Sequence, residues 1–345
     1  MRRTTVLILA VLALVSAVAA VVVVIAHRPA SQIAAGEPFF PQLGVRLGDA
    51  ASLSIKKGDS SFELVRKDDK WVLPAKGDYP ARADLVRGVL IGLSETRTIE
   101  AKTRDPKLYD RLEVEDAGAD GKSTEIAVKD KDGAVLADLL LGKRRGSIGD
   151  VESNNALVYA RKAGDAQSWL VMTALEPRTN EVDWAARDVV DIPEDQVTSV
   201  TLTGGDGQSF TVERAKPDDK DFALHDKPAD MNIKSQFDVN SIAEALSSLT
   251  FEDVMPAAKL AVPPTGTSKA DYLTKDGLHV VVTLVPRDTE KWALITAAGE
   301  GDAAAKAAEI TTRVTGWAYR LPDYKSGKIE TKKADLLEKP AKPQG

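Results

Sequence analysis

The feature that most constrains this chain is a long apolar run close to its N-terminus. Residues 6–26 form a run of 21 residues in which only Ser16 is polar. At roughly 1.5 Å per residue, a helix of that length spans about 30 Å, the thickness of a bilayer's hydrocarbon core. Arg2 and Arg3 precede the run, and basic flanks stay on the cytoplasmic side. The sequence therefore predicts one N-terminal transmembrane helix with a cytoplasmic N-terminus.

A cleaved signal peptide is the competing interpretation of the same run. Ala17-Val18-Ala19 fits an A-x-A cleavage site. Cleavage there would leave an apolar stub, however, and the run is longer than the usual signal-peptide core of about 7–15 residues. We therefore expect an uncleaved anchor. The predicted location is the inner (cytoplasmic) membrane, as a single-pass protein whose C-terminal modules lie in the periplasm.

Small residues share one face of the predicted membrane helix. They are spaced by three, four and three positions, and they are Ala10, Ala13, Ala17 and Ala20. Helices in lipid meet through small residues because these allow the backbones to approach closely. This face is a candidate contact with a partner helix. The alternative is that alanine only fills the anchor.

Composition excludes several classes of protein. Of the 345 residues, 43% are hydrophobic and 28% are charged, which is typical of a folded chain of about two domains. The formal net charge of −6 argues against nucleic acid as a partner. The chain has no cysteine, so disulfides, thiolate metal sites and a cysteine nucleophile are excluded.

Two stretches beyond the run carry similar elements in the same order. Strands at 52–55 and 199–202 are each followed by a turn rich in Gly and Asp, which predicts hairpins. Asp-Gly turns at 131–133 and 275–277 predict a second hairpin in each stretch. Between them, apolar residues with i, i+3, i+4, i+7 spacing predict a helix in each stretch: Val86, Val89, Leu90 and Leu93, and Ile242, Ala245, Leu246 and Leu249.

Two further pairs of residues support this parallel. Asp84 and Asp238 stand ahead of the two helical faces, where a carboxylate caps free backbone N–H groups. A Trp-Ala-x-Arg sequence follows each stretch, at 184–187 and at 317–320. The prediction is an α+β protein with two similar modules that arose by internal duplication. The alternative is two unrelated α+β segments, because hairpins and amphipathic helices recur widely.

The predicted organisation has five parts. They are an N-terminal membrane anchor at 1–28, a stalk at 29–49, a first α+β module at 50–193, a second at 194–324, and a Lys/Pro-rich tail at 325–345.

Candidate chemistry is sparse. The three histidines stand far apart, and no nucleophile has a base at a motif spacing, so we predict no catalytic residue, no metal ligand and no cofactor. Lys143, Arg144 and Arg145 lie between two glycines in an acidic chain. They are a candidate contact for a phosphate or carboxylate. A solvated surface loop is the alternative.

The order of short motifs resembles a known family. The motifs include Trp71-Val72-Leu73, Leu139-Leu140-Leu141-Gly142 and Val158-Tyr159-Ala160-Arg161. The ending Trp317-Ala318-Tyr319-Arg320-Leu321-Pro322 is also similar to the endings of these proteins. The family is the bacterial domain of unknown function 4340 (DUF4340). The resemblance implies a membrane-anchored envelope protein, often encoded beside gliding-motility-type ABC transporter components, and it transfers no functional residues.

Three functions are open at this point. We expect a non-enzymatic accessory or scaffold subunit of an ABC-type transport complex, resembling a gliding-motility auxiliary component. The alternative is a periplasmic binding module for a glycan, lipid or peptide. An envelope hydrolase comes third, because no nucleophile is recognisable. The expected partners are the membrane and ABC transporter subunits, and the sequence names no small-molecule ligand.

Overall fold

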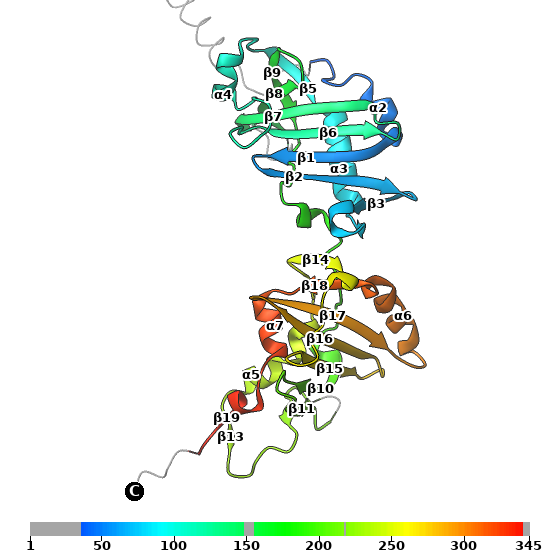
Figure 1. Cartoon of the computed structure of the whole chain (residues 1–345), viewed down its shortest axis with the longest axis vertical. Coiled ribbons are helices and arrows are strands. Elements are labelled where there is room, and N and C mark those ends of the chain that lie inside the picture. Colours follow the sequence, from blue (N-terminus) through cyan, green and yellow to red (C-terminus); the bar gives the residue numbers. More distant parts are fainter. Residues whose placement is uncertain (1–35, 148–154, 217–218, 341–345) are drawn as a thin grey trace, which may run out of the picture. The chain divides into compact units, whose positions relative to one another are not determined.

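The computed structural model of the chain describes residues 36–147, 155–216 and 219–340 (Figure 1). By their contacts, the residues divide into two compact units. Of the described residues, the first unit contains those up to Asp69 and those within Ala83–Thr179, and the second contains Lys70–Arg82 and those from Asn180 to residue 340. The expected modules, 50–193 and 194–324, placed Lys70–Arg82 with the first half of the chain, whereas its contacts group it with the second.

The first unit is an antiparallel sheet with one long helix. Neighbouring strands follow the order β2-β1-β6-β7-β8-β9-β5. The strands are β1 (Ala50–Lys57), β2 (Ser60–Lys67), β5 (Arg97–Ala101), β6 (Thr124–Asp130), β7 (Val135–Ser147), β8 (Ala156–Lys162) and β9 (Ser168–Thr173). The helices and 3-10 turns are α2 (Leu43–Arg46), η2 (Leu47–Asp49), α3 (Ala83–Glu95), η4 (Pro106–Leu108) and α4 (Tyr109–Leu112). The predicted apolar face of α3 is buried, as its spacing indicated.

The second unit is a second antiparallel sheet, with neighbours in the order β12-β11-β10-β15-β16-β17-β18-β14. Its strands are β10 (Val197–Thr203), β11 (Ser209–Glu213), β12 (Ala223–Leu224), β14 (Asp253–Pro256), β15 (Ser268–Thr274), β16 (His279–Arg287), β17 (Glu290–Ala298) and β18 (Trp317–Arg320). Two further strand pairs are short: β3 (Lys70–Leu73) with β4 (Tyr79–Pro80), and β13 (Asn232–Ile233) with β19 (Leu337–Glu338).

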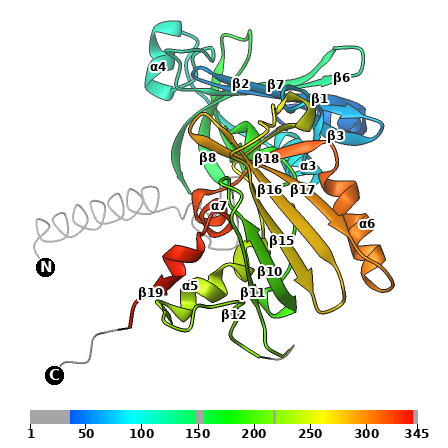
Figure 2. The same cartoon turned by 60° about the horizontal axis from the view of Figure 1, so that its bottom comes forward.

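Short helices and 3-10 turns surround this second sheet. The helices are α5 (Gln236–Ser241), α6 (Ala303–Val314) and α7 (Asp323–Ile329). The 3-10 turns are η3 (Pro74–Lys76), η5 (Glu181–Trp184), η6 (Glu194–Gln196), η7 (Ala243–Leu246), η8 (Ala257–Lys259) and η9 (Lys333–Leu336). Helix α6 lies along strand β17 (Figure 2). Its buried residues Ala303, Ala307, Ile310 and Val314 recur at one helical face, which explains this packing.

The second predicted helix is much shorter than its apolar spacing suggested. Helix α5 ends at Ser241, and η7 carries part of the apolar face. Ser248 then adopts a left-handed conformation with φ 47°, and its backbone N–H donates to Asp191. The apolar residues of 242–249 are still buried, because a 3-10 turn also directs side chains of this spacing inward.

The predicted α+β fold class is wrong, because the described chain is mostly β-sheet. Strands hold more of the described residues than helices and 3-10 turns together. The cause is visible in the burial patterns, because strands such as β15 alternate buried and partly exposed residues with a period of two. In addition, all but two of the helices in the described ranges have seven residues or fewer.

The structure also corrects the predicted topology. Within residues 36–147, 155–216 and 219–340, no helix is long and apolar enough to cross a membrane. The longest helix there, α3, has 13 residues, whereas a crossing needs about 20. This finding contradicts the predicted transmembrane fold and the predicted location as a single-pass inner-membrane protein. The run at 6–26, with Ala10, Ala13, Ala17 and Ala20, lies outside the described residues.

A buried aromatic cluster attaches the segment Lys70–Arg82 to the rest of the second unit. The Tyr79 ring packs edge-on against Trp317 at 4.8 Å and against Phe251 at 5.5 Å between ring centres. Its hydroxyl donates to the carbonyl of Ala186 at 2.9 Å, and burial raises the pKa of Tyr79 to about 12. Nearby, Lys76 Nζ lies 2.7 Å from Asp253. The segment is therefore an integral part of the second unit.

Candidate functional site

The predicted anion contact lies in strand β7 and not in a loop. Lys143, Arg144 and Arg145 are exposed and follow one another within this strand. Arg144 Nη1 lies 2.6 Å from Glu176 Oε1, so this guanidinium already has an anionic partner. The pairing between β7 and β8 is irregular on both sides of Arg144. An anion contact at these three residues stays a prediction.

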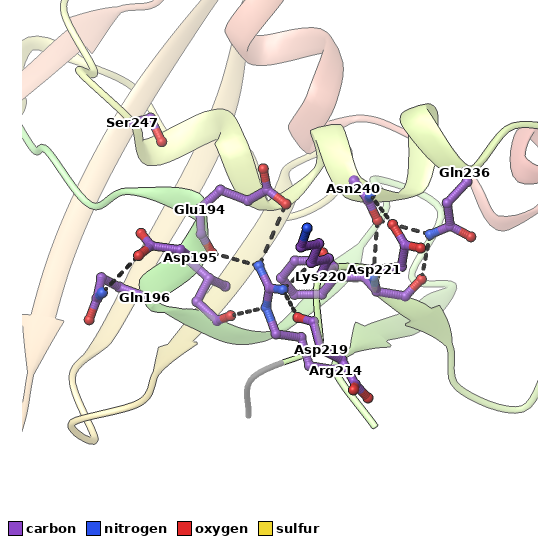
Figure 3. Close-up of polar contacts among 12 residues, drawn as sticks. Glu194, Asp195, Gln196, Arg214, Asp219, Lys220, Asp221, Gln236, Asn240 and Ser247 are labelled. Atoms are coloured by element: carbon purple, nitrogen blue, oxygen red, sulfur yellow. Dashed lines mark hydrogen bonds and ion pairs between the residues drawn. The ribbon is translucent and has the colours of Figure 1, made fainter. Parts of the chain in front are cut away.

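A buried arginine organises one side of the second unit (Figure 3). The Arg214 side chain is 6% exposed and follows strand β11. Its guanidinium donates to the carbonyls of Val197 and Glu194, at 3.0 and 3.1 Å. It also donates to the carbonyls of Asp219 and Lys220 and lies 4.3 Å from the Phe222 ring centre. Arg214 therefore ties η6 and the start of β10 to the turn at 219–222.

Helix α5 is fixed to the same turn by its polar side chains (Figure 3). Asn240 donates to the Asp221 carboxylate at 2.8 Å and accepts from the backbone N–H of Phe222 at 3.0 Å. Gln236 donates to the carbonyl of Phe222 at 2.8 Å. Ser235 caps the helix by accepting from the backbone N–H of Asp238. This short helix is therefore held on both its first and its last turn.

A buried lysine fixes helix α7 to η7. Lys325 is 6% exposed, and its Nζ donates to the carbonyls of Glu244 and Ser247, at 3.0 and 2.6 Å. Burial lowers the pKa of Lys325, and the charge of Lys328 lowers it further. Lys328 Nζ lies 2.7 Å from Glu244 Oε2. These contacts join α7 to the 3-10 turn η7 and to Ser247, which follows it.

The elements that are fixed in this way enclose a pocket of about 370 Å³, which we call the α5–α7 pocket. Its lining comes from α5, α7 and the residues after α7: Asp238, Ser241, Tyr324, Gly327, Lys328, Glu330, Thr331, Asp335 and Leu336. Tyr324 is 63% exposed, and Phe237, which precedes Asp238, is 72% exposed. Exposed aromatic rings on braced helices are typical of contact surfaces.

Two other cavities within the described ranges differ in character. One of about 570 Å³ in the first unit is lined by Arg46, Arg66 and several aspartates. Its arginines are engaged, because Arg46 pairs with Asp49 and Asp130, and Arg66 pairs with Asp69. The other, of about 350 Å³, lies beside α6 and contains the Lys306–Asp276 ion pair. No aromatic residue lines either cavity.

The hydroxyls of the α5–α7 pocket are not arranged for nucleophilic chemistry. Ser241 donates to the carbonyl of Asp238, and Thr331 donates to the carbonyl of Gly327. A catalytic hydroxyl needs a base within hydrogen-bond reach. Among the described residues, no group of three or more His, Asp or Glu side chains is placed to hold a metal ion.

The sequence analysis singled out one residue of this pocket, Asp238, but assigned it a different role. Asp238 was expected to cap a helix, but Ser235 is the cap, and the Asp238 side chain lines the pocket. Residues from Lys325 onward were expected to form a tail, whereas α7 spans Asp323–Ile329. The Pro322-Asp323 pair is a helix-start signal that could have indicated α7.

The comparisons with known proteins identify a family and no more. The model of the family "Domain of unknown function (DUF4340)" matches residues 71–272, which is more than half of the chain. The chain therefore belongs to this family. Comparison with curated proteins and with solved structures found no match.

Proposed function

We propose that the protein is a non-enzymatic accessory or scaffold subunit that binds another protein, and that its partner is an ABC-type transport complex. Membership of the family supports the proposal through the genomic association that the resemblance implies. The structural observation that carries it is the braced pair of helices α5 and α7, which exposes Phe237 and Tyr324.

The use of buried charge supports a binding role over catalysis. Arg214 and Lys325, both 6% exposed, direct their donors to backbone carbonyls. Arg161, 5% exposed, likewise donates to the carbonyl of Val114 at 2.8 Å. A general acid or base must instead lie within hydrogen-bond reach of the substrate's reacting group. These cations brace loops, which keeps a surface rigid for a partner.

Site-specific photo-crosslinking tests the proposal. Phe237→p-benzoylphenylalanine places a photoreactive ring at the exposed end of α5 in the full chain, expressed in its own cells. The expected result is a covalent adduct with a transport-complex subunit, identified by mass spectrometry. Val45, 90% exposed in the first unit, provides the matched control position. Equal adducts from positions 45 and 237, or adducts at 237 that contain no transport subunit, would contradict the proposal.

A second candidate function is a binding module for a glycan, lipid or peptide. The cavity of about 570 Å³ in the first unit favours it, because small-ligand pockets commonly measure about 300–1,000 Å³. Thermal-shift screening of the purified chain against soluble glycans, lipids and peptides tests it. A shift that Arg66→Ala abolishes would support this function, and the absence of any shift at millimolar ligand would argue against it.

A further inference from the structure

We infer that the α5–α7 pocket receives an arginine side chain of a partner protein. The inference rests on the proposed function as a protein-binding subunit and names the surface and the chemistry of the contact. The pocket, of about 370 Å³, is large enough for one long side chain.

The first argument is the supply of hydrogen-bond acceptors. The Asp238 carboxylate makes no hydrogen bond or ion pair within the described residues. Asp335 accepts only a long bond, 3.4 Å, from the backbone N–H of Lys332. The hydroxyls of Ser241 and Thr331 donate to their own backbone and so offer the ligand no donor. A group rich in donors and free of acceptors fits such a lining, and a guanidinium is that group.

The second argument is charge. The other charged side chains of the lining have partners: Lys328 pairs with Glu244 at 2.7 Å, and Glu330 pairs with Lys291 at 2.7 Å. Neither Asp238 nor Asp335 forms an ion pair with a side chain of the described chain. These two carboxylates attract a cation and disfavour a phosphate or a carboxylate.

The third argument is the aromatic surface. The Tyr324 ring is 63% exposed, and its hydroxyl makes no hydrogen bond within the described residues. A planar guanidinium stacks on such a ring while it donates to carboxylates, which an ammonium does less well. Lys325 Nζ lies 5.7 Å from the centre of this ring, but its protons go to the carbonyls of Glu244 and Ser247. Lys325 is also not part of the pocket lining.

The fourth argument is a glycine in the pocket wall. Gly327 lies inside α7, and a Cβ at this position would meet nothing within 4 Å. Glycine inside a helix costs about 1 kcal/mol relative to alanine. Because Gly327 has no side chain, the space beside it is unfilled and a ligand can approach the helix backbone.

Saturation-transfer NMR on the full chain tests the inference with two matched peptides. The probes are acetyl-Gly-Arg-Gly-amide and its citrulline counterpart, which has nearly the same shape but no charge. We expect saturation of the arginine methylene protons and at least about fivefold weaker binding of the citrulline peptide. Equal binding of the two peptides would overturn the inference.

Two pocket variants and one control locate the binding. Gly327→Phe fills the pocket, and Asp238→Asn removes one charge, so each should weaken arginine binding about fivefold or more. Gly88→Phe is the control, because Gly88 is also helical, exposed and free of neighbours within 4 Å of its Cβ, but lies in α3. Undiminished binding by Asp238→Asn or by a folded Gly327→Phe would place the arginine elsewhere. Binding of a neutral N-acetylglucosamine trimer in its place would identify a glycan site and overturn the inference.

The experiments distinguish a failure of this inference from a failure of the proposed function. If the photo-crosslink at position 237 captures a transport subunit but the arginine peptide does not bind, the scaffold role stands and the pocket inference falls. If the peptide binds as expected but no transport subunit is captured, the pocket inference stands and the proposed partner falls.

Discussion

The two sheets share a strand order but use an equivalent arginine in opposite ways. The first unit runs β2-β1-β6-β7-β8-β9-β5, and the second runs β11-β10-β15-β16-β17-β18-β14 in the same sequence of roles. Ser52 pairs with Val65, and Ser199 pairs with Glu213, so Arg66 and Arg214 occupy equivalent positions by register. Arg66 lies near the end of β2, and Arg214 directly follows β11. Both donate to a carbonyl just before the first strand.

The difference between the two arginines is their access to water. The Arg66 side chain is 37% exposed and borders a cavity, whereas Arg214 is 6% exposed and covered by Phe222. A buried guanidinium must have its donors satisfied, because an unpaired buried charge is costly. The second unit meets this need with four carbonyl oxygens. The same position in the strand order therefore holds a buried structural arginine in the second unit and an exposed arginine in the first.

The largest expected effect concerns Lys70–Arg82, the segment from the first half of the chain that belongs to the second unit. Tyr79→Ala removes a ring that is 2% exposed and the hydrogen bond to Ala186. We expect it to lower the free energy of unfolding of the second unit by about 3–5 kcal/mol through lost contacts and a cavity. The variant should accelerate hydrogen exchange strongly in β18 and much less in β6. Equal acceleration in both strands would contradict this view of the segment.

The two arginines provide the next test. Arg214→Ala removes the hydrogen bonds that the guanidinium donates to the carbonyls of Val197, Glu194, Asp219 and Lys220, so a loss of about 3 kcal/mol is expected. Arg66→Ala removes an exposed contact and should cost less than about 1 kcal/mol. Urea unfolding of both variants measures the difference. Similar midpoints for the two would show that burial does not distinguish them.

A third test uses a buried carboxyl of the first sheet. Asp138 lies in β7, opposite Ala127, and register places Val281 at the matching position of the second sheet. Burial, and then the charge of Glu125, raise the pKa of Asp138 to about 6 from the usual 3.8. Asp138 Oδ1 is buried without a hydrogen-bond partner in the described chain. Ionisation of Asp138 is therefore unfavourable in the folded state.

The sign of the pH dependence follows from this shift. Between about pH 4 and pH 6, the folded chain holds a proton that the unfolded chain has released, so stability falls as the pH rises through this window. Asp138→Val should stabilise the first unit at pH 7 by roughly 1 kcal/mol, a value reduced for partial solvent access. It should also flatten the profile between pH 4 and 6. Thermal unfolding at several pH values tests both points, and a variant that is less stable at pH 7 would refute the assignment.

The smallest effect compares helical glycines in the two units. Gly88 in α3 and Gly327 in α7 have no neighbour within 4 Å of a Cβ. Alanine at either position should stabilise its helix by about 0.5–1 kcal/mol, because alanine loses less backbone entropy on folding. Differential scanning calorimetry can resolve such changes. A destabilising Gly327→Ala alone would show that α7 tolerates less bulk than α3.

Local signals predicted much of the fold. The turn at Gly58-Asp59 joins β1 to β2, and the Asp-Gly turns join β6 to β7 and β15 to β16, as the sequence indicated. The face of α3 was also correct. These features depend on neighbouring residues, so their spacing is sufficient to place them.

Long-range features could not be predicted in this way. The sequence matched Trp184 with Trp317, but Trp184 lies in the 3-10 turn η5, while Trp317 begins β18. By strand order, the counterpart of β18 is β9, where Trp169 opposes Ala101 as Trp317 opposes Pro256. Helix α6 is inserted between β17 and β18, and this insertion shifted the match. The α5–α7 pocket was missed for a similar reason, because its walls are about 85 residues apart in the sequence and meet only through folding.

The attachment of Lys70–Arg82 to the second unit has a consequence for synthesis on the ribosome. Tyr79 is made well before Trp317, and at roughly 5–20 residues per second the delay between them is roughly 10–50 seconds. During that interval, Val72, Leu73 and Tyr79, all buried in the finished protein, have no second unit to cover them. The nascent chain thus carries an apolar segment that lacks its final contacts until the second unit has been synthesised.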